Sequence, residues 1–187
     1  MNDLQPADFR NPAILLSGHV DDAMYRSFRK QLDEAPAKGL LAIELTTLGG
    51  DPEVARMMGE DIRFHSDLDP DRRFVFLGKA AIYSAGTTFL SFFARHNRYL
   101  TRGTRLMIHE RQFDKEVKLA GPLTSCAAVI RAKLHEIEAS IAIQNEGFEY
   151  LIKDSKVSRE EVLKRATDNW YIEAQEAVEL GLIQAVI

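Results

Sequence analysis

Two residues in this sequence have the chemistry of a nucleophile and a base, and each directly follows or lies close after a short apolar segment. Residues 74–77 lead toward Ser84, and residues 105–108 end at His109. Small residues surround the serine, and an apolar helical pattern follows it: Ala80, Ala81, Ala85 and Gly86, then Phe89, Leu90, Phe92 and Phe93. Small neighbours let a substrate backbone approach, and the N–H groups at a helix start can stabilise negative charge. The pattern indicates a serine nucleophile site.

Both residues also have an ordinary structural explanation. Serine is favoured at helix N-caps, and a histidine after a strand is commonly a packed or solvated side chain. The residue types alone leave both interpretations open, so the elements around them must decide.

The composition narrows the function classes. The 187 residues fit one domain with a core of its own, and a net charge of -4 without a basic stripe argues against nucleic-acid binding. Cys126 is the one cysteine, so neither an intramolecular disulfide nor a cysteine-rich metal site is expected, and no cofactor is predicted. Residues 1–12 lack a signal-peptide core, and no apolar run has membrane-spanning length, so we expect a cytoplasmic location.

Apolar runs alternate with helical patterns along the chain. Asp21 and Asp22 begin a helix whose Met24, Phe28 and Leu32 share one face. A second helix is expected to turn Val54, Met57, Met58 and Ile62 inward. Strands are predicted at 13–16, 40–45, 74–77, 99–100, 106–108 and 182–187. This alternation predicts an α/β fold with a mostly parallel sheet.

Two further segments stand out. Gly49 and Gly50 separate a strand from a helix, where glycines allow a tight turn and expose backbone N–H groups. Taken by themselves, the two glycines slightly favour a glycine-rich loop without function, and the phosphate-loop pattern is absent. From Pro122 to Lys153 the helical pattern is almost uninterrupted and corresponds to a helix on the order of 45 Å long. That length exceeds what one core needs, so part of this helix is expected to pack on another subunit.

Four segments together resemble the Clp protease proteolytic subunit, ClpP, and its peptidase relatives in the ClpP/crotonase fold. They are residues 15–22, the turn 48–50, Tyr83-Ser84-Ala85-Gly86, and Leu106-Met107-Ile108-His109, and residues 176–183 resemble the closing helix and strand of the family. The resemblance implies repeated β-α units, a mostly parallel sheet and a protruding handle helix. It places a short N-terminal arm at 1–12 and a single peptidase domain at 13–187.

The resemblance also implies roles for individual residues. Ser84 would attack a peptide carbonyl, His109 would act as base, and the backbone N–H groups of Gly50 and Ala85 would form the oxyanion hole. The aspartate of the family falls in register with Arg165 or Ala166, so Asp168 is the nearest carboxylate that could complete a triad. Asp168 is equally well explained as a turn residue.

We therefore expect a serine endopeptidase that cleaves unfolded or short peptides within a homo-oligomer, either a ring or a double ring. The alternative is a ClpP-like subunit with impaired catalysis that serves a structural or regulatory role. Acyl-thioester chemistry of the crotonase type is a third hypothesis, disfavoured because Ser84 and His109 match the peptidase positions. Docking to an AAA+ ATPase is not expected, since the axial loops of the family are longer than residues 1–12. Residues 110–113 replace the family's proline-glycine region after the histidine, which predicts an altered contact between rings.

Overall fold

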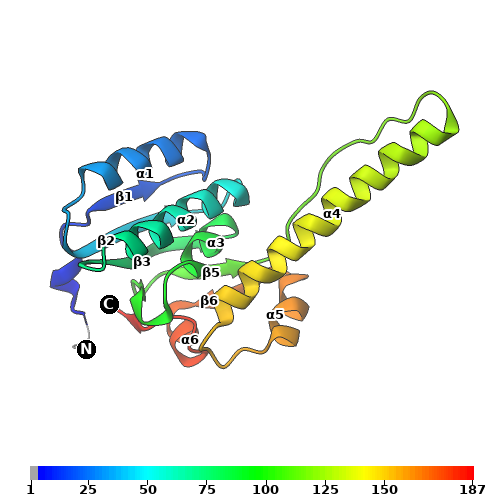
Figure 1. The fold of residues 1–187 in the computed structure, drawn as a ribbon. Coiled ribbons are helices and arrows are strands. Elements are labelled where there is room, and N and C mark those ends of the chain that lie inside the picture. The colour runs from blue at the N-terminus through cyan, green and yellow to red at the C-terminus, as the bar shows by residue number, and fades with distance from the viewer. Residues whose placement is uncertain (1–3) are drawn as a thin grey trace.

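The computed structural model describes residues 4–187, and within them a single sheet forms the centre of the molecule (Figure 1). Its main path runs in the order β1-β2-β3-β4-β7, and β5 pairs with β3 and with β6. The pairs are parallel except for β5 with β6. The strands are β1 (Ile14–Ser17), β2 (Gly39–Thr47), β3 (Arg72–Tyr83), β4 (Arg98–Leu100), β5 (Arg105–Ile108), β6 (Trp170–Glu173) and β7 (Ala185–Val186). This arrangement confirms the predicted α/β class with a mostly parallel sheet.

Helices connect most of these strands, and several of them begin at a capping side chain. The carboxylate of Asp21 accepts a hydrogen bond from the Met24 N–H, and the Ser158 hydroxyl accepts one from the Glu161 N–H. The helices are α1 (Asp22–Glu34), α2 (Pro52–Leu68), α3 (Ala85–Ser91), α4 (Leu123–Ile152), α5 (Arg159–Ala166) and α6 (Ala174–Glu179), with 3-10 turns at Pro6–Phe9 and Arg95–Asn97. None of the helices in residues 4–187 combines the length and apolar character needed to cross a bilayer.

The inward faces of α1 and α2 follow the predicted periodicity with one difference. Met24, Phe28 and Leu32 are buried on α1, and Val54, Met58 and Ile62 are buried on α2. The prediction for Met57 was wrong, because this side chain is 44% exposed. Met57 precedes Met58 by one position, and successive helical residues are rotated by about 100°.

The part of the N-terminal arm that the structure describes is attached to the body. Phe9 is buried, and its ring lies 5.2 Å from the ring of Tyr99 on β4. Residues 1–3 of the predicted arm lie outside the described range. The contact between Phe9 and Tyr99 therefore packs this segment against β4.

Strand β3 changes its neighbour part-way along its length. Phe76–Gly78 pairs with Arg98–Leu100 of β4, whereas Ala81–Tyr83 pairs with Arg105–Met107 of β5. Between the two halves, Ala80 adopts a φ of 58°, a conformation unusual for a residue with a side chain. The change of partner brings the ends of β3 and β5 side by side.

Helix α4 projects from the body, and residues 110–122 run alongside it without regular secondary structure (Figure 1). Its buried side chains, Phe148 and Leu151, are confined to its last two turns. Several large apolar side chains elsewhere on this projection are exposed: Phe113, Val117, Leu119, Leu123, Val129, Ile130, Leu134 and Ile141. We call residues 110–144 the arm.

A buried arginine ties three parts of the fold together. Arg98 is 2% exposed, and its guanidinium donates to the carbonyl oxygens of Ser91, Phe93, Tyr150, Leu151 and Leu182 at 2.7–3.2 Å. These five bonds occupy all five N–H donors of the side chain. The pKa of Arg98 is lowered to about 10, chiefly by burial and also by the charge of Arg95, with a partial offset from Asp154. The side chain thus joins α3, the end of α4 and the segment before β7.

We expect Arg98→Lys to lower the free energy of unfolding by about 3 kcal/mol, because an ammonium has three donors for five carbonyl groups. Urea denaturation followed by circular dichroism measures this loss. Arg102→Lys on the exposed surface is the matched control and should change stability by less than about 0.5 kcal/mol. Equal stability of the two variants would contradict the stabilising role of the five Arg98 hydrogen bonds.

Candidate functional site

Ser84 occupies a strained position between β3 and α3. It is the N-cap of α3 with a φ of 53°, a conformation that costs a side-chain-bearing residue about 1–3 kcal/mol. Its N–H donates to the carbonyl of Met107 on β5 at 2.9 Å. Its carbonyl accepts from the N–H groups of Thr87 and Thr88 and from the Thr87 hydroxyl. These contacts hold the backbone on both sides of the serine and so maintain the strained turn.

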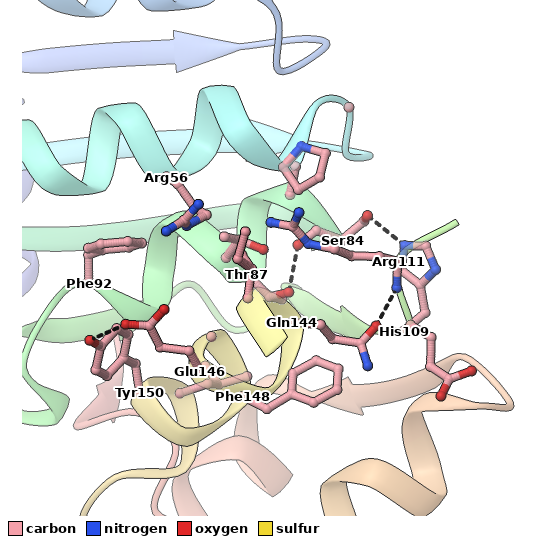
Figure 2. Close-up of a pocket in the computed structure, with 18 of the residues that line it drawn as sticks. Arg56, Ser84, Thr87, Phe92, His109, Arg111, Gln144, Glu146, Phe148 and Tyr150 are labelled. Atoms are coloured by element: carbon pink, nitrogen blue, oxygen red, sulfur yellow. Dashed lines mark hydrogen bonds between the residues drawn. The ribbon is translucent and has the colours of Figure 1, made fainter. Parts of the chain in front are cut away.

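His109 follows directly after β5 and meets Ser84. The Nε2 atom of His109 lies 2.5 Å from the Ser84 Oγ (Figure 2). The pairing of Tyr83 with Met107 explains this proximity, because it sets the ends of β3 and β5 at the same level. Burial lowers the pKa of His109 below its ordinary value. The neutral imidazole is therefore favoured, which is the form that can accept a proton.

The glycine turn after β2 lies against the serine. A Cβ added to Gly49 would approach the Ser84 Cβ to 3.0 Å, and one added to Gly50 would approach the Val20 carbonyl oxygen to 2.3 Å. Only glycine therefore fits at position 50, which also has a φ of 147°. Within residues 4–187, the N–H groups of Gly50 and Ala85 have no backbone or side-chain acceptor. Both residues line the same cleft as Ser84 and His109.

This cleft has a volume of about 200 Å³ and lies between α2, α3 and the last turns of α4 (Figure 2). Its walls combine apolar groups with charged ones, including Phe92, Phe148, Arg56, Glu60 and Glu146. The cleft is large enough for a side chain of a peptide next to the serine. In residues 4–187, no group of three or more His, Cys, Asp or Glu side chains is arranged to bind a metal.

Asp168 lies apart from the serine–histidine pair. It is exposed in the turn between α5 and β6, and across the described residues it forms no hydrogen bond or ion pair with His109. The carbonyl of Ala166 instead adjoins the chain after the histidine and accepts from the Glu110 N–H at 3.3 Å. No other carboxylate in residues 4–187 pairs with His109 either. The role of Asp168 as a third catalytic residue stays a prediction.

Three residues that the sequence reasoning missed line or border the cleft. The amide oxygen of Gln144 on α4 accepts from the Arg111 N–H at 2.6 Å, and the Arg111 guanidinium bonds the Glu53 carboxylate. Burial raises the pKa of Glu53, but hydrogen bonds from Arg111 and Arg56 outweigh it, so the net pKa is lowered. These contacts join residues far apart in sequence, and no local spacing signals them.

The family model for Clp protease matches residues 2–187. The chain belongs to the Clp protease family. Among solved structures, a point mutant of ClpP1 from Listeria monocytogenes superposes with a TM-score of 0.73 at 19% sequence identity. That match covers 93% of this chain and 90% of the Listeria chain. The predicted ClpP-like fold is confirmed, and membership of this protease family fits a cleft that contains a bonded serine and histidine.

In an NMR titration, we expect the His109 imidazole to titrate below 6.5, the ordinary value for histidine. A lowered pKa means that the unfolded chain binds more protons between the two values. The stability from the neutral imidazole is therefore fully present above pH 6.5 and is lost as the pH falls through the folded-state value. Loss of the resonance in His109→Gln assigns it. A pKa at or above that of an unstructured peptide would contradict burial as the controlling effect.

Proposed function

We propose that this chain is a serine endopeptidase that hydrolyses peptide bonds in unfolded or short peptides, with Ser84 as nucleophile and His109 as base. The observation that carries the proposal is the 2.5 Å contact between the Ser84 Oγ and the His109 Nε2, beside two backbone N–H groups that have no acceptor within residues 4–187. Membership of the Clp protease family supports the reaction class.

The proposed reaction begins when the Ser84 Oγ attacks the scissile carbonyl carbon and its proton passes to the His109 Nε2. The N–H groups of Gly50 and Ala85 stabilise the oxyanion, a contribution of about 3 kcal/mol for each donor. The histidine then protonates the leaving amine, and an acyl-enzyme remains on the serine. Water, with His109 again as base, releases the acid and restores the hydroxyl.

The lowered pKa of His109 suits the first step, since a general base must be unprotonated at the working pH. The lowered pKa also limits the driving force for proton transfer from Ser84, because a weaker base takes the serine proton less readily. The proposal therefore assigns chemistry to a serine–histidine pair without requiring Asp168, whose side chain is exposed. A subunit without catalysis is the competing function, favoured by the absence of a carboxylate partner for His109 in residues 4–187.

We also propose that the arm mediates self-association. Exposed Ile130 and Leu134 lie one helical turn apart on α4, and Leu123 is 88% exposed. Apolar side chains grouped on a projecting element are typical of a surface that another chain covers. A second copy of this chain is the proposed occupant, in line with the oligomeric expectation for this family.

A fluorophosphonate probe tests the nucleophile. We expect the intact protein to be labelled at pH 7–8, with labelling absent in Ser84→Ala and at least about 100-fold slower in His109→Gln, because the hydroxyl then lacks its base. Mass spectrometry of the labelled peptide identifies the site.

Two further variants complete the labelling experiment. Asp168→Asn is expected to react within about twofold of the wild-type rate, whereas a loss on the order of 10⁴-fold would give Asp168 the orienting role. Ser91→Ala, at a buried serine outside the pair, should still be labelled. If no serine-dependent labelling occurs between pH 6 and 9, the competing structural role is correct.

Sedimentation velocity tests self-association. At micromolar concentration we expect the wild-type chain to form an oligomer and Leu134→Glu to weaken the association by at least about tenfold, because a leucine leaves a covered apolar surface. Ala132→Glu adds the same charge on another side of α4 and should assemble normally. A monomeric wild-type chain would overturn this part of the proposal.

A further inference from the structure

The chain that follows His109 is fixed to three different elements. The Glu110 N–H donates to the Ala166 carbonyl at the end of α5, and the Arg111 N–H donates to the Gln144 side chain on α4. The Arg111 guanidinium bonds Glu53 on α2. Of the two backbone contacts, that with Gln144 is much the shorter, at 2.6 Å against 3.3 Å.

These backbone contacts matter because the imidazole has few contacts of its own. Within residues 4–187, the His109 ring forms a single hydrogen bond, from Nε2 to the Ser84 hydroxyl, and Nδ1 has no partner. In a serine–histidine–aspartate triad, the carboxylate at Nδ1 orients the ring. Here the orientation of the ring depends instead on where the backbone of residues 109–111 is held.

Gln144 is well placed to hold that backbone. It lies one turn before Phe148 and two turns before Leu151, the side chains that bury α4 against the body, and its own side chain is partly buried. Figure 2 shows the Gln144 amide directed toward the chain beside His109 and away from Phe92 and Tyr150. The acceptor is therefore attached to a part of α4 that the core immobilises.

We propose that Gln144 is a positioning residue for His109: by accepting the Arg111 N–H, it keeps the imidazole within reach of the Ser84 hydroxyl without an orienting carboxylate. This inference rests on the proposed peptidase function of the same site. It assigns Gln144 no contact with the reacting atoms. Its effect passes through the backbone from residue 111 to residue 109.

The test compares variants that keep or remove the acceptor. Gln144→Met removes it at similar volume, and we expect kcat for a fluorogenic peptide to fall by about 10- to 100-fold, the size of effect that a displaced catalytic group produces. Gln144→Glu keeps an oxygen at the same position and should retain activity within about threefold, since a carboxylate accepts from an N–H at least as well. Gln144→Asn withdraws the amide by one methylene and should resemble the methionine variant.

Two controls separate positioning from general effects on α4. Glu149→Met places the same side chain on an exposed position of α4 outside the arm and the cleft, and it should leave kcat unchanged because its ion pair with Arg159 is exposed. Glu53→Gln weakens the side-chain contact of Arg111 but leaves its N–H bonded to Gln144, so its kcat should exceed that of Gln144→Met. If Gln144→Met does not fold, the asparagine variant supplies the comparison.

The NMR titration of His109 distinguishes failure of this inference from failure of the proposed function. In Gln144→Met the imidazole is less firmly held in its half-buried place, so its pKa should rise toward 6.5, and Gln144→Asn should show the same direction of change. A shifted titration in a protein that no fluorophosphonate labels would support positioning and reject the peptidase. An unchanged titration together with unchanged kcat in Gln144→Met would overturn the inference.

Discussion

The break in β3 is the constraint on which the site depends. A regular β3 would keep the same neighbour along each of its two sides, so its pairing with β4 would continue past Gly78. Ala80 takes a positive φ at the point of change, and the second half of β3 pairs with β5. This pairing sets Tyr83 opposite Met107 and so delivers Ser84 and His109 to one edge. The aromatic contacts of Phe89 with Phe28, Phe76 and Phe93 then fix α3 beneath the serine.

The electrostatic features of the body and of the site follow from burial in different ways. Arg98 remains inside the protein because five carbonyl groups replace its water shell. Among the described residues the His109 ring has a single hydrogen bond, and it is half-buried, so the neutral form is the less costly one there. One buried group is thus a fixed structural cation, and the other is a base that can exchange its proton.

Much of this arrangement could be predicted from sequence because it depends on local signals. Periodicity located the inward residues of α1, and apolar runs located the strands, although β2 and β3 extend beyond the runs at 40–45 and 74–77. The long helix was predicted at 122–153 and is observed at Leu123–Ile152. Contacts between distant elements were not predictable, since nothing near Gln144 or Arg98 in the sequence indicates a partner in a distant segment. The burial of Met57 was predicted wrongly because Met57 and Met58 are adjacent and of the same residue type, so the sequence does not show which of the two faces the core.

The position of β7 has a consequence for folding. Ala185 and Val186 pair with β4, the Ile187 N–H donates to the Leu100 carbonyl, and Leu182 supplies one of the acceptors of Arg98. Until residues 182–187 dock on the sheet, β4 has an open edge, and Arg98 lacks one of its five acceptors, the carbonyl of Leu182. An open strand edge is a site for mispairing with other chains. The pairing of Ala185 and Val186 with β4 therefore protects that edge from mispairing once this segment has docked.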